Sequence, residues 1–221
     1  MPRELDNADH QTVTRFLSEQ AERGPEPEQS RARAAIQSGV FYRGDRLLFW
    51  PQAQPRMSYG AVVVNNPNPD LPVGAGGLNK ARLEWNQATQ QIHRDPRPGR
   101  TLAGEYLDSF EATGTLLDRR RSHFAASTIP LTFSKDQPRQ PGVPQIFSAY
   151  EFARWVGWDL HQEFGKLMMA NGTLNQMAFY AHLFDALGAE VNWVRQGRWS
   201  PDSDAELLFR RMYTAESRSC C

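Results

Sequence analysis

Two acidic residues, Asp108 and Glu190, stand where apolar runs of the chain give way to polar sequence. Two carboxyl groups that face each other can break a glycosidic bond, because one protonates the leaving oxygen while the other attacks the anomeric carbon or activates water. The chain therefore predicts a catalytic pair at Asp108 and Glu190. Glu105, on the opposite face of its strand from Asp108, and Glu111, in the loop just beyond, are rival acids or substrate-binding groups. Pairing with arginine or helix capping is the alternative role for all four.

Amide and aromatic residues accompany these acids. Asn171 and Asn192 are expected to bind the hydroxyl groups of a substrate, because an amide both donates and accepts hydrogen bonds. Trp193, next to Asn192, is expected to stack on a sugar face, with core packing as the open alternative. Asn65 begins a loop rich in proline and asparagine and is a candidate for the same pocket, although such loops are commonly plain turns.

The elements that must position these residues follow a serial pattern. Five apolar runs are each followed by a helical pattern, and strands that alternate with helices indicate βαβ units and a parallel sheet. In such a sheet the loops at the carboxyl ends of the strands converge on one crevice, where chemistry gathers. The predicted strands are 61–65, 102–108, 129–133, 166–171 and 189–193.

An open doubly wound sheet and a (β/α)8 barrel both fit this alternation. The barrel is favoured because no G-x-G-x-x-G turn follows a strand and because polar residues end several successive strands. Five good strands, in a chain shorter than the about 250 residues typical of the fold, predict a partial TIM barrel of about five to six βα units. A short N-terminal helix and a β-hairpin precede it. The expected divisions are 1–35 (polar helix and linker), 36–213 (barrel-like domain) and 214–221 (irregular tail).

Apolar spacing and capping signals predict the helices. A helix at 12–23 would bury the side that carries Val13 and Leu17. Ser148 and Glu151 form an S-x-x-E capping box at the start of a helix that ends at Gly165. Further helices are expected around 118–127, along a stripe formed by Ala81, Trp85, Ala88 and Ile92, and along another that runs through Phe179 and Leu183 to Leu187.

Composition limits the partners and cofactors. With 25 basic and 25 acidic residues the net charge is zero, so nothing draws the whole chain to nucleic acid or to an anionic membrane. No apolar stretch approaches the roughly 20 residues that span a bilayer, and the polar N-terminus lacks the apolar core of a signal peptide, so a cytoplasmic protein is expected. The histidines lack metal-ligand spacing, and the two cysteines are adjacent at 220 and 221. Neither a metal, a cofactor nor a disulfide framework is therefore expected.

Four segments, 104–109, 130–133, 159–171 and 190–193, resemble bacterial glycoside-hydrolase-like (β/α)8-barrel proteins, and the resemblance extends over residues 60–213. It implies that Asp108 follows a strand near the fourth of the barrel and Glu190 one near the seventh, which carry the carboxylates in many retaining glycosidases. In other glycosidase barrels the partner comes from the sixth strand. There this chain has Asn171, which cannot transfer a proton. The absence of convincing first strands and the polar tail at 214–221 predict a truncated member.

The predicted function is that of a glycoside hydrolase-like protein that acts on or binds carbohydrate through its carboxylate pair. The alternative is an inactive, truncated barrel fragment that at most binds carbohydrate. A different α/β hydrolase or transferase on an open sheet is the third hypothesis. Because an open barrel leaves edge strands with unpaired backbone groups, self-association is also expected.

Overall fold

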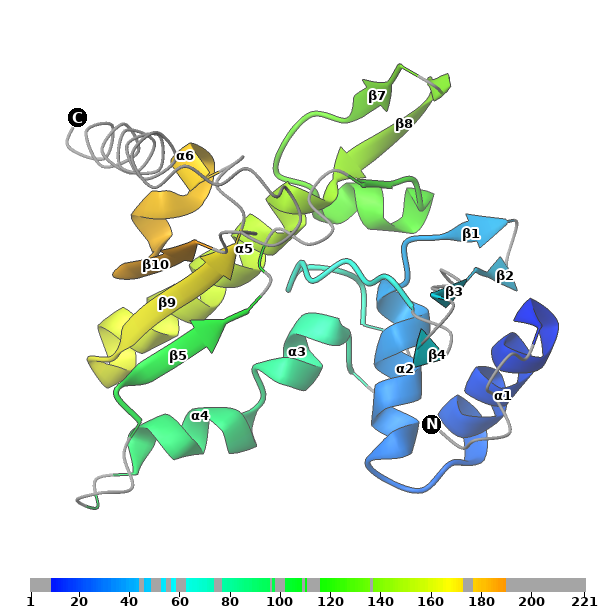
Figure 1. The fold of residues 1–221 in the computed structure, drawn as a ribbon. Helices are drawn as coiled ribbons and strands as arrows, with labels where there is room; N and C mark the ends of the chain where they lie inside the picture. The colour runs from blue at the N-terminus through cyan, green and yellow to red at the C-terminus, as the bar shows by residue number, and fades with distance from the viewer. Residues whose placement is uncertain are drawn as a thin grey trace. The chain divides into compact units, whose positions relative to one another are not determined.

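The chain forms two compact units in the computed structural model, each with its own sheet (Figure 1). Unit 1 comprises Met1–Asn86 and Thr115–Phe152, and unit 2 comprises Gln87–Gly114 and Ala153–Cys221. The residues that the structure describes are 9–43, 46–48, 53–54, 57–58, 63–73, 77–95, 97, 102–108, 110, 116–135, 137–172 and 177–189.

Two packed helices begin unit 1. They are α1 (His10–Arg23) and α2 (Glu28–Ser38). Val13 and Leu17 of α1 are buried and pack with Ala32 of α2 and with Leu47. The helix predicted at 12–23 is confirmed, with the expected side buried. The linker expected within 1–35 is short, because α1 ends at Arg23 and α2 begins at Glu28.

Short antiparallel strands form the sheets of unit 1. The predicted hairpin is confirmed, with β1 (Tyr42–Arg43) paired to β2 (Arg46–Leu47), and a second ribbon pairs β3 (Ala53–Gln54) with β4 (Met57–Ser58). The larger sheet has the order β6-β8-β7, built from β6 (Leu117–Asp118), β8 (Gln137–Pro144) and β7 (Thr132–Ser134). The unit also contains α3 (Lys80–Glu84) and a 3-10 helix, η2 (Arg121–Ala126).

Unit 2 contains a three-stranded parallel sheet of order β10-β9-β5, whose strands Figure 1 draws side by side. Tyr106 of β5 pairs with Met169 of β9, and Ala170 of β9 pairs with Leu187 of β10. The strands are β5 (Gly104–Leu107), β9 (Leu167–Gly172) and β10 (Ala186–Ala189). The helical elements are α4 (Gln87–Arg94), the second half of α5 (Gln145–Trp158), a π-helical turn η3 (Asp159–Phe164), α6 (Met177–Tyr180) and η4 (Ala181–Leu183).

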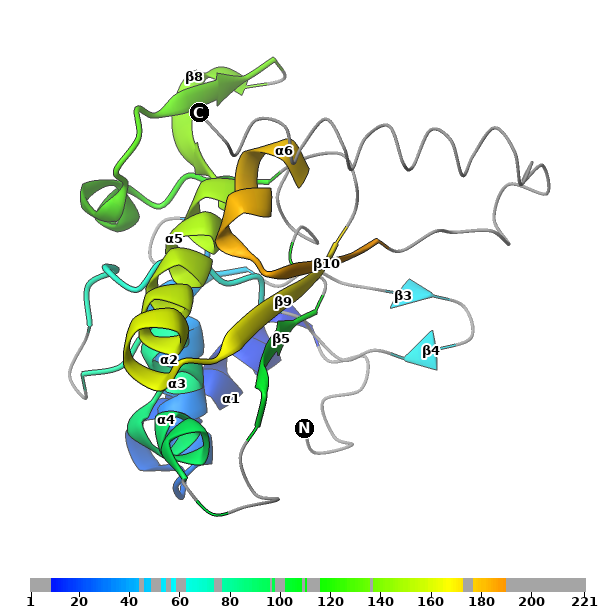
Figure 2. The ribbon, with the colours of Figure 1, turned by 90° about the vertical axis from the view of Figure 1, so that its left-hand side faces the viewer.

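The two faces of this parallel sheet differ. On one face Met168 and Ala170 are completely buried, and the Met168 methyl packs so closely on Gly157 of α5 that a Cβ there would lie 2.8 Å away. Figure 2 shows α5 running along β9. On the opposite face Leu167 and Met169 keep 58% and 38% of their surface exposed. Among the described residues, the sheet of unit 2 is therefore covered on one side only.

The prediction of a partial TIM barrel is wrong. The described sheets are a three-stranded parallel one, a three-stranded antiparallel one and two antiparallel ribbons of two strands each, and the described residues form no closed barrel. The run at 129–133, expected as a parallel barrel strand, contributes β7, which pairs antiparallel with β8. Short apolar runs have the same pattern in both kinds of sheet, so periodicity did not separate them.

Two predicted helices are also wrong in part. The segment 118–127 begins in strand β6 and continues as the 3-10 helix η2. The helix predicted to reach Leu187 ends at Leu183, and Leu187 lies in β10 instead. Leu183 and Leu187 are four residues apart, which suits a helix, but the second segment pairs in parallel with β9 instead.

The predicted capping box at Ser148 and the predicted helical stripe from Ala81 to Ile92 also need correction. Helix α5 begins at Gln145, so Ser148 lies inside its first turn, where its buried hydroxyl has no hydrogen-bond partner among the described residues. The end at Gly165 is confirmed by its left-handed backbone, with φ of 60°. The stripe from Ala81 is interrupted at Trp85, where α3 ends, and Ile92 of α4 is half exposed.

Candidate functional site

Three polar side chains meet at the carboxyl ends of β5 and β9. The Asn171 side-chain amide donates to Asp108 Oδ1 at 3.0 Å. The Tyr106 hydroxyl donates to the same oxygen at 3.2 Å. Asp108 is exposed and Tyr106 keeps 51% of its surface exposed, so this cluster is open to solvent.

The strand register explains why these residues meet. Leu107 pairs with Ala170 in a parallel ladder, so the next residues along, Asp108 and Asn171, emerge at the same edge. Tyr106 precedes Asp108 by two residues and shares its face, as strand alternation requires. The Phe110 amide then donates to the Asn171 carbonyl at 2.9 Å, which holds the chain beyond Asp108 against β9.

An aromatic cluster anchors this edge of the sheet. The ring of Phe110 makes edge-on contacts with Tyr180 and Phe184, with centroids 4.8 and 5.2 Å away. Tyr180 and Phe184 also contact each other edge-on, at 5.9 Å. Because edge-to-face pairs stabilise one another beyond their buried area, the turn after Asp108 is fixed by packing as well as by hydrogen bonds.

The chemistry available at this cluster follows from its donors and acceptors. Both contacts to Asp108 Oδ1 come from donors, which is what an ionised carboxylate accepts. Asn171 also carries an amide oxygen that can accept a hydrogen bond. The arrangement therefore suits a ligand rich in hydroxyl groups, each of which can both donate and accept.

The remaining predicted site residues lie elsewhere or outside the described residues. Glu105 points away from Asp108, because its Oε1 lies 2.8 Å from Nε2 of the buried His93 in α4. Asn65 belongs to unit 1, where it forms an isolated bridge with Gly39 and donates to the Val63 carbonyl at 3.1 Å. The residues outside the described part of the chain are Glu111, Glu190, Asn192 and Trp193.

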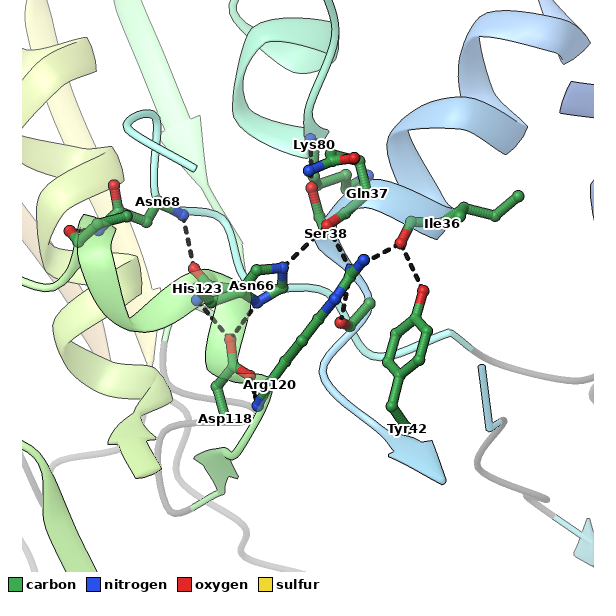
Figure 3. A network of polar contacts seen from close by, with 12 residues as sticks. Ile36, Gln37, Ser38, Tyr42, Asn66, Asn68, Lys80, Asp118, Arg120 and His123 are labelled. Atoms are coloured by element: carbon green, nitrogen blue, oxygen red, sulfur yellow. Dashed lines mark hydrogen bonds and ion pairs between the residues drawn. The ribbon is translucent and has the colours of Figure 1, made fainter. Parts of the chain in front are cut away.

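Unit 1 contains a buried histidine–carboxylate pair that the sequence reading missed (Figure 3). Nδ1 of His123 lies 2.6 Å from Asp118 Oδ2, and that oxygen also accepts from the Asn66 amide at 2.7 Å. The Arg120 backbone amide donates to the other oxygen at 2.9 Å. Nε2 of His123 lies 2.9 Å from the Gln37 carbonyl, which can only accept, so this nitrogen carries a proton.

Arg120 extends this network to the end of α2. One guanidinium nitrogen donates to the carbonyls of Ile36, Gln37 and Gly39 at 2.8, 2.6 and 3.4 Å. A cation is favourable there because the last carbonyls of a helix carry partial negative charge. The same guanidinium lies over the Tyr42 ring at 4.2 Å. Burial raises the pKa of Tyr42 above its ordinary value of 10.0, although Arg120 acts in the opposite direction.

The saturation of this network argues for a structural role. Both nitrogens of the His123 ring face acceptors inside the protein, and Asp118 and His123 are completely buried. A general base must reach a ligand proton directly or through one water. His123 offers no such approach in this arrangement, so the network joins α2, the loop at 66–68 and η2 rather than forming a catalytic centre.

A third histidine–carboxylate pair, besides His93–Glu105 and His123–Asp118, lies in unit 2, where β9 and β10 begin. His161 Nε2 lies 2.8 Å from Asp185 Oδ2, which also accepts from the Met168 amide at 2.8 Å. This pair lies at the amino ends of β9 and β10, because Met168 is near the start of β9 and Asp185 directly precedes β10. Asp108 lies at the opposite, carboxyl ends of the strands. It holds the start of β10 against β9.

The described residues contain neither a metal-binding cluster nor a membrane-spanning helix. In the described part of the chain, no three histidine, cysteine, aspartate or glutamate side chains come close enough together to hold a metal ion. Nor do the described helices include one with the length and apolarity needed to cross a membrane.

Comparison with protein-family models, with curated proteins and with solved structures finds no match to this chain. The resemblance to glycoside-hydrolase-like barrels therefore stays a prediction.

Proposed function

We propose that unit 2 binds carbohydrate at the carboxyl edge of its parallel sheet and cleaves a glycosidic bond there. The observation that carries the proposal is the hydrogen bond of 3.0 Å between Asn171 and Asp108 at a solvent-exposed edge. Sugar hydroxyls can donate to Asp108 and accept from Asn171. A bound sugar could therefore replace the hydrogen bond between Asn171 and Asp108 with one hydrogen bond to each of them.

Asp108 is proposed as the carboxylate that attacks the sugar or activates water. Its oxygen already accepts from two donors, so the ionised form is the one its neighbours satisfy. The proton for the leaving oxygen must then come from another acid, because the amide of Asn171 has none to transfer.

Glu190 is the proposed proton donor. It follows Gly188 of β10 by two residues, and Gly188 belongs to the face that carries Asn171, since a Cβ at Gly188 would lie 3.4 Å from Asn171 Oδ1. Glu190 lies outside the described residues, and its assignment rests on sequence parity with Gly188, because residues two apart in a strand share a face. Strands β5 and β10 flank β9, which separates their ends by about 10 Å. This spacing is closer to the roughly 6.5–9.5 Å between the carboxyl groups of inverting enzymes than to the about 5–5.5 Å of retaining ones, so inversion is proposed, with Asp108 activating water.

The test is hydrolysis of a panel of aryl glycosides by the full chain. Asp108→Asn and Glu190→Gln are expected to lower the rate at least about 100-fold, because each removes a group needed in the transition state. Glu163→Gln is the matched control: this acid is exposed in η3 and pairs with Arg94, away from the site. It is expected to retain the rate, and nuclear magnetic resonance of the first-formed anomer reads out inversion. Equal rates for Asp108→Asn and the unmodified chain would refute the assignment.

Binding without hydrolysis is the second candidate. It is favoured by one observation: the two groups that donate to Asp108 Oδ1 are a phenol and an amide, and neither is a second carboxyl group. In that case, no aryl glycoside is cleaved, while calorimetry detects methyl glycoside binding that Asp108→Asn removes. If the unmodified chain neither hydrolyses aryl glycosides nor binds methyl glycosides, both candidate functions are excluded.

A further inference from the structure

We infer that the open face of the parallel sheet binds an apolar group attached to a neutral, hydroxyl-bearing ligand, such as the alkyl or aryl aglycone of a glycoside. This inference rests on the proposed function, because the hydroxyl-bearing part would occupy the cluster of Asp108 and Asn171. The inference adds that the protein prefers glycosides whose aglycone is apolar. The surface concerned is called the apolar strip and consists of Tyr106, Leu167 and Met169.

The apolar strip leads directly to the polar cluster. Tyr106 and Met169 are register partners on neighbouring strands, about 4.8 Å apart. Leu167 and Asn171 lie two residues before and after Met169 on the same face of β9, so the strip reaches about 13 Å from the cluster end to Leu167. The three side chains are 51%, 58% and 38% exposed for Tyr106, Leu167 and Met169.

The charge of this face selects the ligand. None of its described strand residues is acidic or basic in type; they are Gly104, Tyr106, Leu167, Met169, Asn171, Ala186 and Gly188. The acid of β5, Glu105, is engaged with His93 on the other face. Asp108 at the end of the strip repels anions, so a phosphorylated or carboxylated sugar is disfavoured and a neutral one is favoured.

The size of the strip favours a small molecule over a protein. Three strands span about 10 Å, and four residues of β9 span about 13 Å. A stable protein interface buries about 800 Å² on each partner, several times what such a patch offers. An apolar substituent of a small ligand, in contrast, can lie along the strip while its sugar reaches Asp108.

The experiment is a calorimetric series of methyl, butyl and hexyl β-D-glucosides and β-D-galactosides with the full chain. Affinity is expected to rise with chain length, by about twofold to fourfold for each methylene, the upper figure corresponding to complete burial. Leu167→Thr and Met169→Thr are expected to flatten this rise, because threonine suits a strand but removes most of the apolar surface. Phe133→Ser, which removes an exposed apolar residue of β7 in unit 1, is the matched control and should leave the series unchanged.

The variants separate this inference from the proposed function. Methyl glycoside binding that Asp108→Asn removes, without any gain from a longer chain, would overturn the inference and leave the proposed function standing. A gain that Phe133→Ser abolishes and Met169→Thr does not would also overturn it. If hexyl glycosides bind through the strip while Asp108→Asn changes nothing, the proposed function fails, and with it the hydroxyl half of the inference.

Discussion

At the scale of single residues, burial separates two histidine–carboxylate pairs that otherwise look alike. The side chains of His123 and Asp118 are both 0% exposed, whereas those of His161 and Asp185 are 35% and 38% exposed. Removing one member of a buried pair leaves a charge without compensation in a medium that cannot hydrate it. An exposed pair loses little, because water replaces the missing partner.

His123→Phe is therefore expected to lower the free energy of unfolding by about 3–5 kcal/mol, because Asp118 would remain buried with one donor fewer. His161→Phe is the matched control, with an expected loss below about 1 kcal/mol. Urea denaturation followed by circular dichroism measures both. Similar losses in the two variants would show that the network around Asp118 is not the enclosed element described above.

Asp185 makes the stability of unit 2 depend on pH. Burial opposes its ionisation, but hydrogen bonds from the Met168 amide and from His161, with the charge of His161, hold the pKa of Asp185 below its ordinary value of 3.8. The unfolded chain therefore takes up the proton first. The contribution of this carboxylate is present above about pH 4 and is lost as the pH falls through the pKa of the folded form.

The corresponding variant is Asp185→Asn, compared with the unmodified chain by urea denaturation between about pH 3 and 6. The unmodified chain is expected to be the more stable at the upper end, with a difference that shrinks below about pH 4. A difference that stays constant over this range would mean that the carboxylate has the same proton affinity in the folded and unfolded chains.

At the scale of elements, the pairing of β5 with β9 depends on a glycine. A Cβ at Gly104 would collide with the carbonyl oxygen of Leu167 and lie 2.7 Å from its carbonyl carbon. At Gly188 of β10 the nearest atom to such a Cβ is 3.3 Å away and belongs to the flexible Met169 side chain. The two glycines therefore tolerate a methyl group very differently, although both lie in the same sheet.

Gly104→Ala is expected to destabilise unit 2 by about 1–3 kcal/mol or more, because backbone cannot yield as a side chain does. Gly188→Ala is the matched substitution and should cost less. Thermal unfolding of both variants gives the comparison. An unchanged midpoint for Gly104→Ala would contradict the close approach of the two strands.

The elements that the sequence predicted well are those with a long or strongly amphipathic pattern. Helix α1 and the helix ending at Gly165 follow from apolar spacing and a left-handed C-terminal glycine. Strands β5 and β9 follow from their apolar runs, and with them the emergence of Asp108 and Asn171 at strand ends. Their meeting at 3.0 Å needed the register, which no local pattern contains.

The prediction of a barrel was wrong for a physical reason, and the same reason explains why the network around Asp118 was not predicted. Whether a short apolar run pairs parallel or antiparallel depends on contacts between distant segments, as for β7 and β8. Likewise His123 meets the Gln37 carbonyl, 86 residues away along the chain, and no spacing rule connects such positions. Tertiary contacts determine both the strand pairing and the contact of His123 with Gln37, and such contacts produce no periodic pattern in the sequence.

At the scale of the whole molecule, charge and chain path are the features that matter most. The net charge is zero, so two copies of the chain meet no overall repulsion, and the self-association expected from open sheet edges stays a prediction. Each unit is assembled from two separate stretches, so the chain leaves unit 1 after Asn86, returns at Thr115 and leaves again after Phe152.

This interleaved path has a consequence for the order of events during synthesis. The helices α1 and α2 emerge from the ribosome early, but Arg120 and His123, to which the end of α2 is bonded, emerge only after residues 87–114 of the other unit. At about 5–20 residues per second that delay lasts seconds, far longer than a helix needs to form. Nascent α2 is therefore expected to keep its last carbonyls hydrated during this interval, within reach of chaperones and proteases.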